Sequence, residues 1–353
     1  MNQIIYDKKN ILVAGGAGFI GSNLCERLVK DNKVICVDNF VSGQEANIDN
    51  LLSNPNFLFL RHDLTKPLVL ENYPGTKKFK VEGQGIQEVY NFACPSSSKH
   101  FENFKIETIL ANSHVTKNIL DLAVKYKAKL VHGSTSSIYG SPLEGQRTFD
   151  EKYWGFIDPV GPRACYNEGK RFAESLIVTY REKHKLDFKI ARIFNTYGPK
   201  MKLDSGRMIP DFVNAAINNI DLEIKGSGQE ISSYCYIADM LDGIVKLMDS
   251  PEYGPINLGN QDIYTLEDIA KDVIEIAESD SKISYGEPLP YLNKQGLPDI
   301  SLAKEKLAWF PVIKLKEGLS KTIEDMKGAR VITYTSEKSK QENNEVNSNH
   351  TSI

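Results

Sequence analysis

A glycine-rich turn between a short apolar run and an apolar-periodic segment is the feature that most constrains the fold of this chain. Residues 11–13 (Ile-Leu-Val) are followed by glycines at positions 15, 16, 18 and 21, and apolar residues then recur at helical spacing up to Val29. Glycine adopts positive φ, and because it lacks Cβ it lets a pyrophosphate approach the amide groups at the positive end of a helix. The pattern therefore predicts a strand, a tight turn and a helix that bind a dinucleotide.

The residue at the end of the next expected strand indicates which dinucleotide binds. That strand covers residues 33–38 and ends in Asp38, about 20 residues beyond the glycines, as the dinucleotide fingerprint requires. A carboxylate accepts a hydrogen bond from a ribose 2′-hydroxyl but repels a 2′-phosphate, so the sequence predicts NAD rather than NADP. The alternative is a glycine-rich turn in another kind of α/β protein, with Asp38 as a surface turn residue.

Strands and helices alternate over the first 199 residues, which predicts a parallel sheet of Rossmann type. Further strands are expected at residues 56–60, 88–93, 129–134 and 188–194, and long helices at 104–126 and 166–183. Beyond residue 199 the pattern changes to helices at 209–218, 237–248, 266–277 and 301–307, with short strands such as 222–224 and 255–258.

These patterns predict an α/β fold with two parts and a tail. Residues 1–199 are expected to form a doubly wound parallel sheet of Rossmann type that binds NAD. Residues 200–328 are expected to form a smaller C-terminal lobe, which caps the sheet edge and mainly binds the substrate. Residues 329–353 are expected to be a polar tail, disordered from about residue 336.

Composition and charge exclude several classes of function. The chain has 353 residues, 41% of them hydrophobic, and can bury a large core. Its net charge of -3, without a basic run, gives no attraction to nucleic acid or to an anionic membrane, and no apolar run is long enough to span a bilayer. Its five cysteines are scattered, as in reduced cytosolic proteins. We therefore expect a cytoplasmic protein that binds no metal, nucleic acid or membrane.

A tyrosine and a lysine one helical turn apart give the second specific signal. Tyr166 and Lys170 share a face of their expected helix, so their polar atoms can converge. A phenol, with a pKa of about 10, is a poor base at pH 7, but lowering that pKa by about three units needs only about 4 kcal/mol from a nearby cation. Tyr166 is expected to take a proton from a substrate hydroxyl that Thr135, at a strand end, holds in place. The alternative is an ordinary helix face.

Several motifs together resemble one enzyme family. The glycine turn, the strand end Ser134-Thr135, the Tyr166-x-x-x-Lys170 pair and Asn195-Thr-Tyr-Gly-Pro199 resemble the extended short-chain dehydrogenase/reductases that act on nucleotide sugars. Three blocks, 153–155, 161–171 and 191–199, resemble more narrowly the UDP-glucuronate decarboxylase family, and the resemblance runs from about residue 10 to about residue 328. It implies that bound NAD oxidises C4 of the sugar, that the β-keto acid loses CO₂, and that the same hydride reduces C4 again.

Three positions depart from that family. It has a glutamate where this chain has Ser137, and arginines where this chain has Ser232 and Gly296. The resemblance implies that the glutamate serves the steps after oxidation and that both arginines make bidentate contacts with the substrate pyrophosphate, which serine and glycine cannot reproduce. Alternatives to a decarboxylase are a nucleotide-sugar 4-epimerase, which Ser137 favours, a 4-dehydrogenase or dehydratase, and an NAD-binding protein that has lost its activity. Other cations that could replace the arginines, although each is expected to be a solvated surface residue, are Lys99, Arg163, Lys202, Arg207 and Lys225.

The motifs and the resemblance give a set of expected site residues. The expected catalytic residues are Thr135, Tyr166 and Lys170. The expected NAD contacts are Gly15, Gly18, Phe19, Ile20, Gly21, Asp38, Asn39, Asp63, Leu64, Ala93, Asn112, Tyr166 and Lys170. The expected contacts with the nucleotide sugar, which is expected to be UDP-linked, are Lys99, Ser136, Ser137, Asn195 and Arg207.

The resemblance also implies a homodimer. The helices expected at 104–126 and 166–183 are similar to those that form a four-helix interface in this family. Both carry apolar residues beyond a single stripe, such as Val124, Phe172 and Ile177. The alternative is that these side chains simply pack on the sheet.

Overall fold

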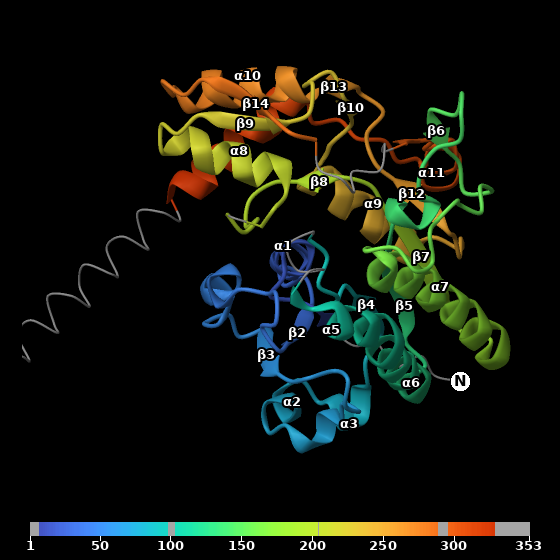
Figure 1. The fold of residues 1–353 in the computed structure, drawn as a ribbon. Coiled ribbons are helices and arrows are strands. Elements are labelled where there is room, and N and C mark those ends of the chain that lie inside the picture. Colours follow the sequence, from blue (N-terminus) through green and yellow to red (C-terminus); the bar gives the residue numbers. More distant parts are fainter. Residues whose placement is uncertain (1–6, 98–102, 204, 289–295, 329–353) are drawn as a thin grey trace, which may run out of the picture.

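Seven parallel strands form the central sheet of the protein (Figure 1). The computed structural model describes residues 7–97, 103–203, 205–288 and 296–328. The strand order is β12-β7-β5-β4-β1-β2-β3, and the expected Rossmann-type parallel sheet is confirmed. Its strands are β1 (Asn10–Ala14), β2 (Lys33–Asp38), β3 (Phe57–Arg61), β4 (Glu88–Asn91), β5 (Lys129–Thr135), β7 (Phe188–Ile193) and β12 (Ile256–Leu258).

Alternate residues of the first strand enter two separate apolar cores, one on each face of the sheet. Val13 belongs to one cluster of buried side chains and Leu12 to the other, because successive side chains of a strand point to opposite faces. Burial on both faces explains why the strand sequence is continuously apolar. The first face is covered by α1 (Phe19–Leu28) and α9 (Ile237–Asp249), and the second by α6 (Thr116–Tyr126) and α7 (Ala164–His184).

A π-helical turn interrupts the long helix expected at 104–126. The helix α5 (Lys105–Leu110) leads into the turn η4 (Ala111–Val115), which continues into α6. Such turns insert an extra residue and are frequent at functional sites. Asn112, an expected NAD contact, lies in this turn. The other long helix, α7, begins two residues before the expected start at 166.

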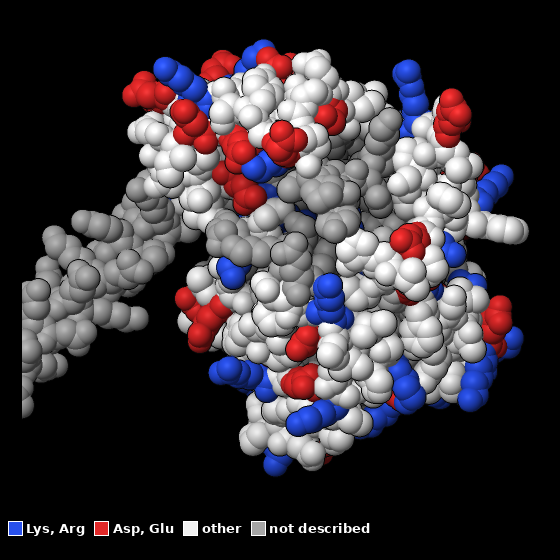
Figure 2. Space-filling view, viewed as in Figure 1, with Lys and Arg blue, Asp and Glu red and all other residues white. Residues whose placement is uncertain are grey.

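The chain beyond residue 199 contributes to the lobe and also to the sheet. In the lobe, α8 (Met208–Ile217) packs against α10 (Leu266–Ala277), and β9 (Leu222–Lys225) pairs with β14 (Ile283–Gly286). The strand that we expected in the lobe at 255–258 is instead β12, the edge strand of the sheet next to β7. The division of the chain at residue 199 stays a prediction. Acidic side chains gather over the lobe and basic ones over the lower sheet domain on the face in Figure 2.

Short strand pairs connect segments that are distant in the sequence. The pairs are β6 (Thr148–Phe149) with β15 (Leu297–Pro298), β8 (Thr196–Tyr197) with β11 (Cys235–Tyr236), and β10 (Ile231–Ser232) with β13 (Tyr264–Thr265). The remaining helices include α2 (Gly75–Lys78), α3 (Val81–Gln84) and α11 (Ser301–Leu307). Among the described helices, none has both the length and the apolar character to cross a membrane. The predicted tail, 329–353, lies outside the described residues.

Candidate active site

The glycine turn lies between β1 and α1, at the carboxyl end of the sheet. Gly15 has a φ of +75°, and a Cβ there would lie 2.7 Å from the backbone nitrogen of Ala93, which follows β4. A Cβ on Gly21 would overlap the carbonyl oxygen of Gly15, so both positions require glycine. The N-cap of α1 is Gly18, and no side chain caps the helix. The first amide groups of α1 are therefore suited to bind a pyrophosphate.

Asp38 joins the end of β2 to the glycine turn. Its Oδ1 accepts a hydrogen bond of 2.8 Å from the amide of Phe40, and its Oδ2 accepts one of 3.0 Å from the amide of Ala17. Burial raises the pKa of this carboxyl, while the two hydrogen bonds lower it. Asp38 is buried, so it is not a surface turn residue. Each carboxylate oxygen keeps a further lone pair, which can accept a hydrogen bond from a ribose hydroxyl.

The other residues expected on the adenosine side differ in placement. Asn39 and Asp63 are exposed, and each accepts a hydrogen bond from the amide two residues further on, at 3.1 Å from Val41 and 3.0 Å from Thr65. Leu64 is buried in the apolar core. Any contact of Leu64 with a cofactor must therefore come from its backbone. Phe19 and Ile20, in the first turn of α1, are partly buried.

The three expected catalytic side chains come together at the carboxyl end of β5. A hydrogen bond joins the side chains of Tyr166 and Thr135, and the Thr135 hydroxyl also accepts the amide hydrogen of Ser137 at 3.2 Å. Lys170 donates a hydrogen bond of 2.7 Å to the carbonyl of Gly133, two residues before Thr135. All three side chains are buried. The helix face of Tyr166 and Lys170 is therefore fixed against the strand end that carries Thr135.

Burial and nearby charges act in opposite directions on this cluster. Burial raises the pKa of Tyr166, whereas the hydrogen bond from Thr135 and the charges of Arg207 and Arg163 lower it. Burial also lowers the pKa of Lys170. From the sequence, Lys170 was expected to be the cation that favours the phenolate. The structure adds the guanidinium groups of Arg207 and Arg163. Sequence reasoning placed both arginines on the solvated surface, which is wrong, because both are partly buried beside Tyr166.

Arg207 also links the lobe to the loop after β4. Its Nη2 donates hydrogen bonds to the carbonyl and the hydroxyl of Ser96, at 3.0 and 2.9 Å. Arg163 precedes Tyr166 by three residues, a spacing that shares a helix face and could have marked it from the sequence. Of the other cations, Lys225 forms an ion pair with Glu223, Lys202 is exposed, and Lys99 lies outside the described residues.

The π-helical turn places Asn112 behind the catalytic helix. Its Nδ2 donates to the carbonyl of Thr108 at 2.9 Å and to the Sγ of Cys94 at 3.3 Å. A Cβ on Gly169, between Tyr166 and Lys170 in the sequence, would lie 3.0 Å from this same Nδ2. Only a small residue at 169 therefore lets α7 approach the turn. Cys94, whose charge acts on Lys170 and on Tyr166, was missed by sequence reasoning, although it follows a strand end.

Of the expected substrate residues that the structure describes, Ser136 and Ser137 follow the end of β5, and Asn195 follows β7, the neighbouring strand of the sheet. Ser136 and Ser137 begin the short helix η5 (Ser136–Tyr139) directly after Thr135, and both are partly buried. Asn195 donates from Nδ2 to the hydroxyl of Ser232 at 3.1 Å. Ser232, at a position where the resemblance expects an arginine, is therefore part of a local hydrogen-bonded contact.

Gly296 lies against an aromatic stack. A Cβ at this position would overlap the ring of Phe149. That ring stacks on Tyr139 with centroids 4.9 Å apart and on Tyr153 with centroids 5.3 Å apart. An arginine at position 296 would therefore require Phe149 to move.

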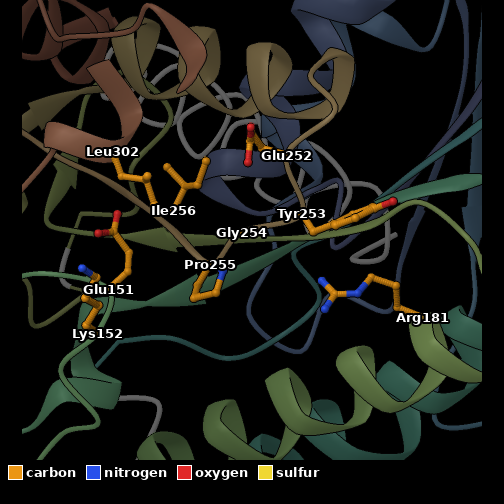
Figure 3. A pocket seen from close by; sticks show the side chains of 9 residues that line it. All are labelled: Glu151, Lys152, Arg181, Glu252, Tyr253, Gly254, Pro255, Ile256 and Leu302. Carbon is orange, nitrogen blue, oxygen red and sulfur yellow. The ribbon is translucent and has the colours of Figure 1, made fainter. Parts of the chain in front are cut away.

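A cavity of about 330 Å³ lies beside the start of β12 (Figure 3). Arg181 lines it from α7, 15 residues beyond Tyr166, which is about 22 Å along a helix. None of the expected site residues lines it; its lining is Glu151, Lys152, Arg181, Glu252, Tyr253, Gly254, Pro255, Ile256 and Leu302.

In the parts of the chain that the structure describes, no group of three or more His, Cys, Asp or Glu could hold a metal ion.

Known proteins are similar to this chain in sequence. The model of the NAD dependent epimerase/dehydratase family matches residues 11–259. UDP-glucuronic acid decarboxylase 6 of Arabidopsis thaliana is 40% identical over 328 residues, which cover 92% of this chain and 91% of that protein.

Solved structures of nucleotide-sugar epimerases are similar to this chain in fold. The UDP-N-acetylglucosamine 4-epimerase of Methanobrevibacter ruminantium, in complex with UDP-N-acetylmuramic acid, has a TM-score of 0.81 at 25% identity and covers 92% of this chain and 100% of its own. The UDP-glucuronic acid 4-epimerase of Bacillus cereus, in complex with UDP-glucuronic acid and NAD, has a TM-score of 0.77 at 27% identity and covers 91% and 99%.

Proposed function

Because the chain belongs to the NAD dependent epimerase/dehydratase family, we propose that it oxidises the C4 hydroxyl of a nucleotide sugar. It is an enzyme of the NAD-dependent sugar-nucleotide decarboxylase, epimerase or dehydratase type, and its cofactor is NAD. The observation that carries the proposal is the convergence of Thr135, Tyr166 and Lys170 at one strand end. It supports a site with a hydroxyl partner, a base and a cation at the edge where parallel sheets bind ligands.

The residues around the glycine turn fit NAD. The close packing at Gly15 and Gly21 leaves an uncapped helix start for a pyrophosphate, and Asp38 keeps lone pairs for a ribose hydroxyl. Bound NAD would supply the hydride acceptor for the oxidation of the sugar carbon and the hydride donor for its later reduction. Tyr166 and Lys170 are the residues that we expect at its nicotinamide end.

The chain's own residues move the proton. Thr135 holds the C4 hydroxyl beside Tyr166, which takes the proton during oxidation and returns it when C4 is reduced again. Burial raises the pKa of Tyr166 overall, and the charges of Arg207 and Arg163 act against burial and favour the phenolate form that accepts the proton. Lys170, anchored on Gly133, adds a buried cation one helical turn away.

The proposed substrate is UDP-linked and the proposed reaction is similar to that of a UDP-glucuronate decarboxylase. The 40% identity to such an enzyme over 92% of this chain supports this assignment. Ser137 favours a second candidate, a nucleotide-sugar 4-epimerase, because position 137 offers no carboxylate for the steps after oxidation. Ser136, Ser137, Asn195 and Arg207 are the described residues that we propose as contacts of the sugar nucleotide.

Product analysis tests the proposal and separates its two forms. The purified protein is incubated with UDP-glucuronate and, as a control without the carboxylate, with UDP-glucose. A UDP-pentose identifies a decarboxylase, and an isomer of unchanged mass identifies an epimerase. If neither substrate reacts although mass spectrometry of the denatured protein finds NAD, C4 oxidation of these sugars is wrong.

We also propose a homodimer formed by α5 and α7, which contact each other. Ile106 and Ile109 of α5 are 70% and 46% exposed, and Phe172 of α7 is 51% exposed. Exposed large apolar side chains on two helices that contact each other favour a protein contact. The expected contribution of Ile177 is wrong, because it is fully buried in the core, and Val124 packs against the same core.

A cytoplasmic location is a further proposal. All five cysteines are free thiols in the structure, including the buried Cys25 and Cys36. Unpaired cysteines are typical of a reducing compartment. Fractionation of the source cells, with this protein detected by antibody, tests the assignment.

A further inference from the structure

A partly buried carboxylate joins two elements of the catalytic cluster. Glu174 lies one turn beyond Lys170 on α7, and its Oε1 accepts a hydrogen bond of 2.6 Å from the hydroxyl of Ser134. Ser134 directly precedes Thr135 at the end of β5. One carboxylate therefore ties the helix that carries Lys170 to the strand end that carries Thr135.

Arg192 of β7 fixes the orientation of that carboxylate. Its Nε donates to Oε1 of Glu174 at 3.1 Å and its Nη2 donates to Oε2 at 2.8 Å, which is the bidentate geometry of strong charge-assisted pairs. The two side chains are only 11% and 12% exposed, so salt and water screen this pair less than a surface pair. The Glu174 carboxylate thus has little freedom to turn away from Ser134.

The same arginine extends the contact toward the lobe. Its Nη1 donates to the hydroxyl of Tyr139 at 2.9 Å, and that hydroxyl donates to Oδ1 of Asn257 at 2.7 Å. The Nδ2 of Asn257 then donates to the carbonyl of Asp299 at 3.2 Å. Asp299 stands three residues after Gly296, so a continuous chain of hydrogen bonds runs from the catalytic helix to the lobe segment that carries Gly296.

We propose that Glu174 is a positioning residue for the redox step, which holds Thr135 and Lys170 in register with Tyr166 through Ser134 and Arg192. This rests on the proposed function, because the register matters only if Tyr166 exchanges a proton with the substrate. Glu174 itself has both oxygens engaged by Ser134 and Arg192, so it acts through these partners and not on the substrate.

The charge of Glu174 also affects the ionisation of Lys170. Burial lowers the pKa of Lys170, whereas the charges of Cys94 and Glu174 raise it. His132, whose pKa is lowered well below its usual range by burial and by the charge of Lys170, stays neutral on the strand side. Loss of the Glu174 charge therefore lowers the pKa of Lys170, and Lys170 loses its proton at a lower pH.

Glu174→Gln is the principal test. Glutamine keeps an oxygen for Ser134 but loses the charge and the bidentate pair with Arg192. We expect kcat to fall by about 10- to 100-fold, as small misplacements of catalytic groups produce, and KM for the nucleotide sugar to change by less than about threefold. The alkaline limb of the pH–rate profile moves to lower pH. The control is Glu182→Gln, an exposed position on the same helix, which changes neither quantity.

Two further variants separate positioning from folding. Ser134→Ala removes only the tie to β5, so kcat falls while the alkaline limb stays in place. Glu174→Asp keeps the charge, so the alkaline limb of its pH–rate profile stays at the wild-type position. A folded Glu174→Gln enzyme with wild-type kcat and an unmoved limb overturns the proposal. If Glu174→Gln does not fold, wild-type kcat in Ser134→Ala overturns it instead.

The affinity for NAD gives a readout that needs no sugar substrate. Calorimetric titration of NAD across the alkaline range is expected to show weakening at a lower pH in Glu174→Gln than in the wild type, because Lys170 loses its charge earlier. If the wild type turns over no nucleotide sugar, the proposed function fails. The titration still decides the effect of Glu174 on Lys170, since identical profiles in both proteins contradict it.

Discussion

Lys170 is a buried lysine on whose charge burial and the neighbouring groups act in opposite directions. Its Nζ donates to the carbonyl of Gly133, and the charges of Cys94 and Glu174 oppose the effect of burial, which lowers its pKa. Because the net direction is downward, Lys170 loses its proton below the ordinary lysine pKa of about 10.4. Activity that depends on this charge therefore falls as the pH rises through the lowered value.

Lys170→Arg tests this pH dependence. The guanidinium stays charged throughout the accessible pH range, so the alkaline limb of the rate profile is expected to move to higher pH. At neutral pH, kcat falls, because a planar guanidinium cannot occupy the position of the ammonium beside Gly133. The measurement is kcat against pH for wild type, Lys170→Arg and the exposed control Lys183→Arg. An alkaline limb that stays in place in Lys170→Arg would show that another group controls it.

We propose that Ser137, Ser232 and Gly296 affect the binding of the nucleotide sugar and the reaction steps after C4 oxidation. Two bidentate arginine contacts, at about 1.5 to 3 kcal/mol for each charged hydrogen bond, are worth several powers of ten in affinity. We therefore expect slow or undetectable xylose formation from UDP-glucuronate, and partial recovery in Ser137→Glu with Ser232→Arg. Adding Gly296→Arg does not help further, because its side chain meets Phe149.

Chromatographic assay of UDP-xylose measures this recovery. The matched control is Ser227→Arg, which places a cation on an exposed turn of the lobe and should leave the rate unchanged. Wild-type turnover of UDP-glucuronate at about 10 s⁻¹, typical of enzymes, would instead support a plain decarboxylase.

At the scale of the elements, the π-helical turn and α7 depend on each other. Asn112 contacts Thr108 and Cys94 from inside the turn, and Gly169 lets α7 approach it closely. The turn therefore sets how deeply the helix of Tyr166 and Lys170 packs against the sheet. A change that separates the two elements displaces the catalytic pair as well.

Gly169→Ala tests this contact. The added Cβ would lie 3.0 Å from the Nδ2 of Asn112, and overpacking of this kind costs about 1–3 kcal/mol. We expect a lower free energy of unfolding in urea and a reduced kcat. Gly83→Ala is the control, because a Cβ there meets nothing within 4 Å. Equal free energies of unfolding for the two variants would mean that the π-helical turn accommodates the added Cβ without a loss of stability.

Elements with local signals were predictable, and those that depend on distant contacts were not. The helix expected at 266–277 is α10 residue for residue, because Thr265 and Asp268 form a capping box that marks its start in the sequence. The π-helical turn is stabilised by contacts with Cys94 and α7, which no local pattern records. The three-residue strand β12 joins the sheet only through its pairing with β7.

The residues of the site also fall into two groups, those that the sequence could predict and those that it could not. The glycine turn, Asp38, Thr135, Tyr166 and Lys170 follow fixed spacings, so the sequence identified them, although their roles stay predictions. Arg163 stands three residues before Tyr166, at the N-cap of the same helix, whereas Arg207 acts on Tyr166 from a separate segment. The approach of Arg207 to the phenol depends on how the lobe meets the sheet, and no spacing along the chain encodes it.

At the scale of the whole molecule, we propose that the exposed apolar residues of α5 and α7 form the interface of a homodimer. Ile106→Glu combined with Phe172→Glu is expected to convert a dimer into a monomer, because burying two carboxylates in an apolar interface is costly. Multi-angle light scattering at micromolar concentration measures the mass. Ile220→Glu, at an equally exposed apolar position of the lobe, is the control and leaves the dimer intact. A monomeric wild type would contradict the proposed dimer.

C4 oxidation through Tyr166 is the central claim about the molecule, and the rate at which bound NAD is reduced in a single turnover tests it most directly. The substrate is UDP-glucuronate with either hydrogen or deuterium at C4, mixed with the wild type or with Tyr166→Phe. We expect the wild type to react more slowly with the deuterated sugar, and Tyr166→Phe, with NAD still bound, to react with neither. Equal wild-type rates for the two sugars, or turnover in Tyr166→Phe, would contradict the claim.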